Sequence, residues 1–329
     1  MNKIKNLIGI ILIAILTLSI INNPLTETYL ATLKLDAEYI STDQNDLYNQ
    51  IVNKADQYSI KPQDARIDKV WKAIPGYNGI EVDIKASYKN MKQDKQFDEN
   101  KLVFKQVPPS IHLKDLPAAP IYRGNPDKPM VSFLINVAWG NEYIPSMLKT
   151  LKDHNIHATF FLEGRWAKNN PDMAKMIVEA GHEIGNHSYT HPDLKTLSSD
   201  RVREELINTN QVIKATTEKQ IRLFAPPSGS YRDEVVKIAD SMNMQTIMWS
   251  VDTVDWQKPS PETIVTRVIS KVHPGALILM HPTESTAKAL DQLINEIRKK
   301  DLRIGTVSKL LDEERIIKVN DGKLKIEKK

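Results

Sequence analysis

The stretch VSFLINVAWGNEY, residues 131–143, begins with an almost unbroken apolar run and ends in a turn around Gly140. A short apolar run that meets a glycine predicts a buried strand followed by a tight turn. In α/β proteins, catalytic side chains lie at the ends of such strands. Asn136 stands where an enzyme of this kind would place a carboxylate, and the first acidic residue of the stretch is Glu142.

An apolar strand followed by a helix recurs along the rest of the chain. Helices are expected near Pro145, from Pro171 and after Pro261, with others through Ile207 and near Val235. Strands and helices that alternate over about 200 residues predict parallel strands in a closed or open α/β architecture, with active residues at the carboxyl ends of the strands. The further predicted strands are ATFFL (158–162), HEIGN (182–186), LFAPP (223–227), QTIMWSV (245–251) and ALILM (276–280).

The part of the chain before these repeats divides at a proline-rich stretch. Six of the 18 prolines lie in residues 108–129, which we interpret as a linker because proline lacks a backbone donor. Residues 40–107 are predicted to form a small α/β domain that serves as a spacer or binding module. Residues 130–315 form the main domain, and residues 316–329 are a lysine-rich tail. The small domain shows helical spacing at Leu47, Ile51, Ala55 and Tyr58, and strand alternation at Ile80, Val82, Ile84, Ala86 and Tyr88.

The N-terminus carries the features of an export signal. Lys3 and Lys5 precede an apolar run from Leu7 to Ile21, about 15 residues long, which suits the h-region of a signal peptide. No clean cleavage site follows, so residues 1–25 are interpreted either as a signal peptide or as an uncleaved anchor. In both cases the rest of the chain is expected outside the cytoplasmic membrane, held at its outer face or secreted to the cell wall.

Composition excludes several classes of function. The 329 residues carry a net charge of only +4, so nucleic acid is not expected as a partner. The chain has no cysteine, which excludes thiolate catalysis, cysteine-ligated zinc and disulfides. A chain of this length still has enough apolar residues for a sizeable core.

The strongest chemical signal is the segment GNHSYTHP, residues 185–192. His187 and His191 are four residues apart, so on one helical turn both imidazoles would point the same way and could bind one metal ion. Such a pair also arises by chance among eight histidines. The polar residues Ser188 and Thr190 between them favour a site over a core position.

Five ordered segments resemble the successive motifs of polysaccharide deacetylases of the NodB-homology type, carbohydrate esterase family 4. The resemblance covers roughly residues 118–315. Its version of the first motif, INVAWGNEY, is most similar to Bacillus-type sporulation or cell-wall deacetylases. The resemblance implies a distorted (β/α) barrel and a divalent metal, Zn²⁺ or another, held by one Asp and two His. The segments are ATFFLEGRWA, GHEIGNHSYTHPDL, FAPPSGSY, MWSVDTVDW and LILMHP.

The resemblance assigns roles to particular residues. His187 and His191 match the metal histidines, and His281 matches the general acid. Asp255 matches the carboxylate that orients and charges His281, although an ordinary turn or helix-cap role for Asp255 remains open. The backbone N–H of Ser228 matches the oxyanion donor.

Two family features are missing. The first motif usually reads Thr-Phe-Asp-Asp-Gly, with one Asp as base and the other as metal ligand, whereas neither carboxylate is present here. Asn136 is interpreted as the degenerate base position, and an amide cannot accept a proton near neutral pH. Ala225 stands in place of an Arg that pairs with the base. Glu142 is the nearest remaining carboxylate that could substitute.

Two functions follow from this pattern. The first is a metal-dependent hydrolase of amide bonds in N-acetylated cell-wall polysaccharide, with feeble activity because the base and the metal Asp are missing. The second is an inactive pseudoenzyme that binds glycan or a partner protein. Trp139, Trp256 and Tyr231 would then offer stacking surfaces for sugar rings, unless these side chains belong to the core.

Overall fold

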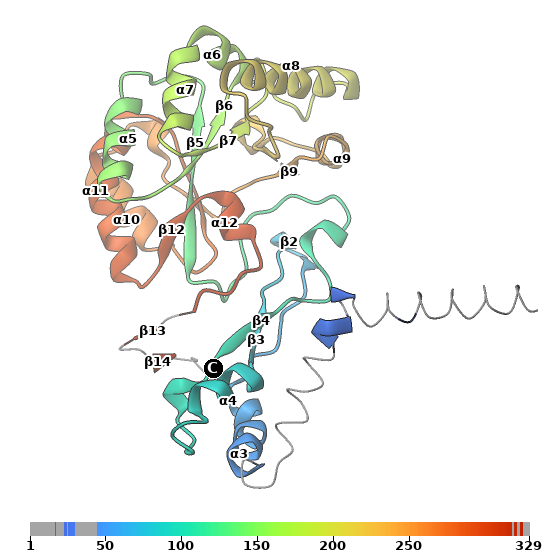
Figure 1. Cartoon of the computed structure of the whole chain (residues 1–329). Coiled ribbons are helices and arrows are strands. Elements are labelled where there is room, and N and C mark those ends of the chain that lie inside the picture. The colour runs from blue at the N-terminus through green and yellow to red at the C-terminus, as the bar shows by residue number, and fades with distance from the viewer. Residues whose placement is uncertain are drawn as a thin grey trace, which may run out of the picture. The chain divides into compact units, whose positions relative to one another are not determined.

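The computed structural model describes residues 17, 23–24, 26–29, 45–317, 319–320 and 323–324 (Figure 1). The chain divides into one unit of residues 1–60, 80–105 and 318–329 and another of residues 61–79 and 106–317. The apolar run predicted as an export signal lies almost wholly outside the described residues, as does most of the lysine-rich tail. Among the described residues, no helix is long and apolar enough to cross a membrane.

In the described part of the first unit, helices α3 (Asn45–Ala55) and α4 (Ile84–Met91) pack around a small core. Helix α3 confirms the helical spacing predicted there. The alternation predicted to continue as a strand through Tyr88 is wrong, because strand β3 (Gly79–Val82) ends where Asp83 begins helix α4. The Asp83 carboxylate accepts the Ala86 N–H at 2.9 Å, which satisfies a free donor of the first turn. The core consists of Leu47, Ile51, Val82, Tyr88 and Met91.

Smaller elements complete this part of the chain. The boundaries of the first unit at residues 80 and 105 fall within β3 and β4 (Phe104–Val107), which pair in a two-stranded sheet. The 3-10 helices are η1 (Asp56–Tyr58), η2 (Glu99–Lys101) and η3 (Leu113–Asp115). The further short strands are β1 (Arg66–Asp68), β2 (Lys72–Ile74), β13 (Val319–Asn320) and β14 (Lys323–Leu324).

The second unit is an α/β fold around one parallel sheet. Its strands follow the order β10-β11-β5-β6-β7-β8-β9, and β12 also pairs with β5. Every described pairing in this sheet is parallel, and no described pairing joins β9 to β10, so the sheet forms an open half-barrel. The strands are β5 (Met130–Val137), β6 (Thr159–Leu162), β7 (Glu183–Asn186), β8 (Leu223–Phe224), β9 (Gln245–Thr246), β10 (Val251–Asp252), β11 (Leu277–Met280) and β12 (Arg303–Gly305).

Strand β5 runs through the middle of this unit and is buried along its whole length (Figure 1). Its side chains alternate between two apolar clusters, as the period of a strand requires. Phe133 and Ile135 join the cluster under the helices, while Leu134 joins the inner cluster. The inner face also carries Ser132 and Asn136, so this face becomes polar toward the carboxyl end of the strand.

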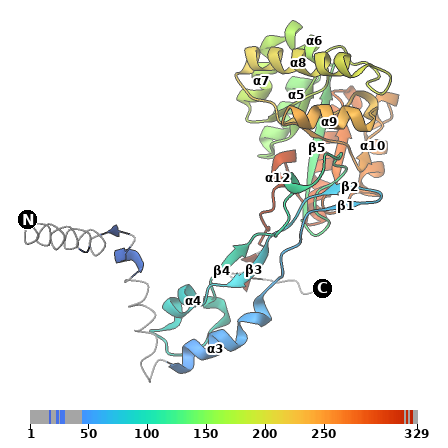
Figure 2. The same cartoon turned by 90° about the vertical axis from the view of Figure 1, so that its right-hand side faces the viewer.

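Helices cover the outer side of the sheet, and α8 lies beside α9 (Figure 2). Several start at a hydroxyl cap, such as Ser198 before α8 and Thr283 before α11. The single strand predicted at QTIMWSV is instead two strands, β9 and β10. The helices are α5 (Ile144–Asp153), α6 (Gly164–Asn169), α7 (Pro171–Glu179), α8 (Ser199–Thr217), α9 (Asp233–Ser241), α10 (Pro261–Ile269), α11 (Glu284–Lys299) and α12 (Val307–Leu311).

The proline-rich segment, residues 108–129, belongs to the second unit. It has little regular structure, as its composition predicts, but it is anchored by buried side chains. Ile121 forms a parallel bridge to Ile247 at the end of the sheet. Lys128 is fully buried and donates to the carbonyl oxygens of Lys309 and Asp312, both at 2.7 Å.

His182 makes the stability of this unit sensitive to acid. Its Nδ1 accepts the Ala158 N–H at 3.1 Å, and burial lowers its pKa to about 4, from an ordinary value near 6.5. Below pH 6.5 the unfolded chain binds this proton more readily, so stability is lost as the pH falls from 6.5 to 4. We expect the His182→Gln variant to lose about 2 kcal/mol less than wild type between pH 7 and 4.5, as measured by urea unfolding. Equal losses in the two proteins would contradict this.

Candidate functional site

His187 is the first residue after β7, and its imidazole is buried. Its Nδ1 lies 2.8 Å from the carbonyl oxygen of Ala225, so Nδ1 carries the hydrogen and Nε2 presents a lone pair. Burial lowers the pKa of His187 to about 3, and the imidazole is therefore neutral at physiological pH. This is the form of histidine that ligates a metal.

His187 and His191 face each other, but not on a helix as predicted. Residues 187–193 form an irregular loop in which Ser188 and His191 have positive φ angles of 60° and 57°. The two rings are 5.0 Å apart between centroids. Glu205, buried on α8, accepts the N–H groups of Tyr189 and Thr190 at 2.7 and 2.8 Å. This carboxylate therefore holds the loop that brings the two imidazoles together.

His281 follows β11 directly and is held by Asp255. The His281 Nδ1 lies 2.8 Å from Oδ1 of Asp255, and its backbone N–H donates to Oδ2 at 2.6 Å. Thr286 donates its hydroxyl to the same Oδ2 at 2.6 Å. Asp255 is fully buried and caps no helix, so the carboxylate serves His281 rather than a turn. His281 Nε2 is left to carry or accept a proton on the other side of the ring.

His187, His191 and His281 line one cavity of about 470 Å³ at the carboxyl ends of the strands. Trp139 lies almost parallel to His281, with 5.9 Å between ring centroids and 10° between planes. The turn that carries Trp139 requires glycine, because Gly140 has φ +83° and a Cβ there would lie 2.0 Å from the carbonyl oxygen of Pro282. The lining residues are Asn136, Ala138, Trp139, His187, His191, Ser228, Trp249, Asp252, Trp256, Leu279 and His281.

Asn136 lies within β5 and not beyond its end. Its side chain is only 4% exposed, and its Oδ1 finds no hydrogen-bond partner among the described residues. The register pairs Asn136 with Phe161 and Phe161 with Gly185, so Asn136 is level with the residue two places before His187. Ala138, the next residue on the same face, is level with His187, about 6.6 Å farther along. On the other side of β5, Met280 of β11 pairs with Ile135, so the next residue, His281, lies beside Asn136.

The other predicted residues fall in different places. Ser228 lines the cavity in the 3-10 helix Pro227–Gly229, with a positive φ of 53°. Tyr231 is absent from the lining and hydrogen-bonds Tyr122 through its hydroxyl at 2.9 Å. Glu142 is exposed in the turn and does not line the cavity.

Four lining residues, Ala138, Trp249, Asp252 and Leu279, are not among the residues predicted from the sequence. Leu279 lies within β11, while Trp249 and Asp252 lie around β10. Their position near the carboxyl edge of the sheet is the signal that could have found them.

The donor set does not fit a catalytic metal ion. Such sites use three protein ligands, whereas this cavity offers the neutral imidazoles of His187 and His191, and Asp252, the one carboxylate in its lining, forms no metal-binding group with them. In the part of the chain that the structure describes, no group of three or more His, Cys, Asp or Glu side chains could hold a metal. At the end of β5, level with His187, the chain presents a methyl group at Ala138, followed by an indole at Trp139.

Comparison with known proteins gives consistent matches. A family model for polysaccharide deacetylase matches residues 123–247. The chain is 53% identical over 296 residues to the uncharacterized protein YlxY of Bacillus subtilis (strain 168), across 90% of this chain and 93% of that protein. It is 33% identical over 197 residues to the peptidoglycan-N-acetylmuramic acid deacetylase PdaA of the same strain, across 58% of this chain and 75% of PdaA.

Solved structures include a relative described as a pseudoenzyme. Wild-type BA3943 of Bacillus anthracis, a pseudoenzyme of carbohydrate esterase family 4, is 58% identical, with a TM-score of 0.77 over 82% of this chain and 96% of that one. A mutant of BA3943, described as having restored enzymatic activity, is 57% identical with a TM-score of 0.77 over 82% of this chain and 99% of that one. The same fold therefore accommodates both a silent and a restored site.

Proposed function

The chain belongs to the polysaccharide deacetylase family, carbohydrate esterase family 4, and on this premise we propose that it binds N-acetylated cell-wall glycan without hydrolysing it. The observation that carries the proposal is the pair Ala138 and Trp139, which replaces the carboxylates beside His187 and His191. A glycan of the peptidoglycan type fits, because PdaA is a peptidoglycan deacetylase.

We assign the missing carboxylates to Ala138 and Trp139 instead of Asn136. Counted back from Gly140, the family pattern Thr-Phe-Asp-Asp-Gly places its two Asp residues at positions 138 and 139. The position of Asn136 then corresponds to Thr, inside the strand. The register supports this assignment, because Ala138 is level with His187.

The residues that remain include a proton donor but not the carboxylate that acts as the base in the family. His281 is oriented by Asp255, and Ser228 offers a backbone N–H at the edge of the cavity. Amide hydrolysis also needs a base to take a proton from the attacking water, and a positioned base contributes about 10²- to 10⁴-fold in rate. A methyl group at Ala138 supplies no such base.

Two exposed indoles in the cavity favour sugar binding over a cavity that has lost all function. Trp139 is 46% exposed and Trp256 is 57% exposed, and both line the cavity. Exposed aromatic faces beside hydrogen-bonding groups suit the apolar faces of sugar rings. Trp139 stands where an active enzyme has its second Asp, so the change that removes the ligand also adds a stacking surface.

We further propose that the protein acts outside the cytoplasmic membrane, at the cell wall, with a role in wall remodelling such as occurs in sporulation. Lys3 and Lys5 before the apolar run support export. Protease added to intact protoplasts should cleave the chain, and full protection would contradict export.

Glycan binding is tested with the Trp139→Ala variant. We expect wild type to bind an N-acetylglucosamine oligomer without releasing acetate, and Trp139→Ala to bind about tenfold more weakly, because one stacking surface is lost. Calorimetry measures binding, and an enzymatic acetate assay measures turnover. Trp71→Ala, which removes an indole outside the cavity, is the matched control. Steady acetate release by wild type, or equal binding by all three proteins, would overturn the proposal.

Zinc binding is expected to be weak. Two imidazoles without an anionic ligand leave the ion without a full protein coordination set, so His187→Ala and His191→Ala should each abolish the remaining affinity. Competition with a chromogenic chelator measures it. A stoichiometric zinc ion that survives prolonged dialysis against EDTA would contradict the expectation.

A further inference from the structure

A second cavity, of about 290 Å³, lies at the end of the strands opposite to the proposed glycan site. Helix α8 ends at Thr217, and the chain turns at Glu218, with a positive φ of 61°, into the segment that precedes β8. The turn between α9 and β9 closes the other side. The cavity therefore lies at the amino ends of β8 and β9, whereas the glycan site lies at the carboxyl ends of the strands.

The lining is basic and has no acidic member. It comprises Asn210, Lys214, Lys219, Gln220, Ile221, Arg222, Met242 and Asn243. Within the described part of the chain, the side chains of Lys214, Lys219 and Arg222 form no hydrogen bond or ion pair. Three cations around one concavity without a counterion create a positive potential that an anion would neutralise.

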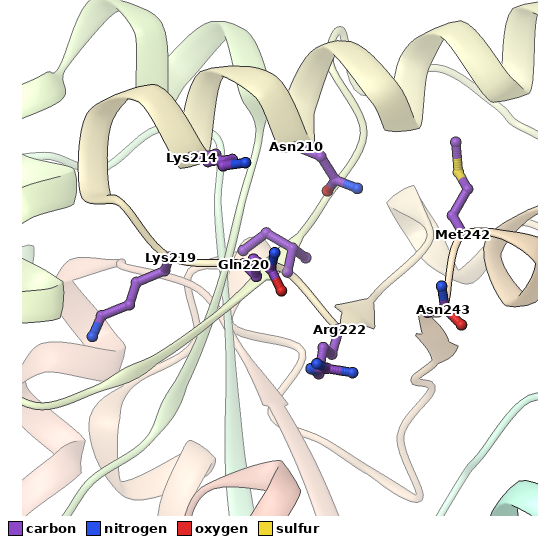
Figure 3. Close-up of a pocket in the computed structure, with 8 residues that line it drawn as sticks. Asn210, Lys214, Lys219, Gln220, Arg222, Met242 and Asn243 are labelled. Carbon is purple, nitrogen blue, oxygen red and sulfur yellow. The ribbon is translucent and has the colours of Figure 1, made fainter.

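The donors reach the cavity from three separate segments (Figure 3). Asn210 and Lys214 project from α8, Gln220 and Arg222 lie below them before β8, and Asn243 comes from the turn before β9. Lys219 extends away from this group in the same view. The Asn210 amide oxygen accepts a hydrogen bond from Asn186 at 2.8 Å, and the Asn210 amide nitrogen donates to Sδ of Met244 at 3.4 Å. The Arg222 guanidinium, the Lys214 ammonium and the Gln220 and Asn243 amides remain as free donors among the described residues.

We propose that this cavity binds a phosphate group, carried by an anionic polymer or a lipid headgroup. A phosphate ester presents several oxygens in a tetrahedral arrangement, so it can accept from donors that converge from different directions. Arg222 can donate two parallel hydrogen bonds to two of these oxygens, and Lys214 adds a point charge. A carboxylate has two oxygens in one plane and would leave part of this donor set unused. The proposal does not depend on glycan binding at the carboxyl ends of the strands.

The test uses the full chain and glycerol 3-phosphate as the probe, at about 0.15 M salt to screen non-specific attraction. We expect calorimetry to show saturable binding by wild type. Arg222→Gln and Lys214→Gln should each weaken it about tenfold, since each removes a charged donor. Lys175→Gln, on the exposed surface of α7, is the control with the same loss of charge.

Two further comparisons identify which molecule carries the phosphate group and whether the cavity prefers phosphate to carboxylate. Poly(glycerol phosphate) and vesicles that contain phosphatidylglycerol are compared for binding that depends on Arg222; dependence with either one supports the proposal and names the source. Acetate is the carboxylate comparison. The proposal is overturned if glycerol 3-phosphate does not bind, if acetate binds equally well, or if Arg222→Gln and Lys175→Gln behave alike.

Discussion

Replacing both Ala138 and Trp139 by Asp is expected to give this protein measurable deacetylase activity. The two carboxylates would stand beside His187 and His191, one as base and one as the missing anionic ligand. His281, which Asp255 already orients, would supply the leaving amine with a proton. We expect a gain of at least about 10²-fold over wild type in acetate released from a chitooligosaccharide with zinc in excess.

Adding Ala225→Arg should raise the activity further. A new carboxylate at position 138 would be partly buried, which raises its pKa and keeps it partly protonated. Residue 225 lies beside His187 on the neighbouring strand, so a guanidinium there would favour the charged form of the new carboxylate. The triple variant should therefore exceed the product of the separate gains, because groups that act as one unit are not additive. The BA3943 mutant described as restored supports the feasibility of such a change.

Asn136→Asp is the matched control for this series. It adds one carboxylate, compared with two in the variant with Asp at 138 and 139, and places it within β5, one inward position before 138 and level with Gly185. We expect it to remain inactive. If Asn136→Asp, with or without Ala225→Arg, released more acetate than the variant with Asp at 138 and 139, the base position would be Asn136 after all. Turnover by wild type equal to that of every variant would implicate another base; Asp252, which lines the cavity, would be tested first, and Glu142, which does not, second.

Lys128→Ala is expected to destabilise the second unit by about 3 kcal/mol, because it leaves buried polar groups without their partner. The Lys128 ammonium is fully buried and lies 2.6 Å from Oδ1 of Asp312, in addition to the two carbonyl oxygens that it serves. Its removal would leave these acceptors without a donor and open a void the size of the side chain. Urea unfolding followed by tryptophan fluorescence measures the change.

Lys309→Ala is the control for Lys128→Ala. Lys309 also pairs with Asp312, at 3.0 Å, but its side chain is 52% exposed. An exposed pair of this kind contributes roughly 0–1 kcal/mol. Similar losses in the two variants would show that burial of Lys128 does not govern its contribution.

Local sequence was sufficient for the elements that form the second unit. Apolar runs ending in polar residues marked strands β5, β6 and β11, because a strand buried on both faces cannot carry charges along its length. The ordered motifs also identified His281 and Asp255, which the fold brings to 2.8 Å from each other. Where local signals competed, the sequence misled: the alternation through Tyr88 obeyed the period of a strand, but the Asp83 cap began a helix.

Only the tertiary structure decided how the site is assembled. His187 and His191 meet because Glu205, on a helix distant in sequence, holds the loop between them, and helical spacing plays no part. The depth of Ala138 relative to Asn136 depends on the register of β5, β6 and β7, which no single strand encodes. Burial of Lys128 likewise depends on carbonyl groups at the far end of the chain. A local pattern specifies which face of a strand or helix is apolar, but distances between side chains are set by long-range pairing and packing.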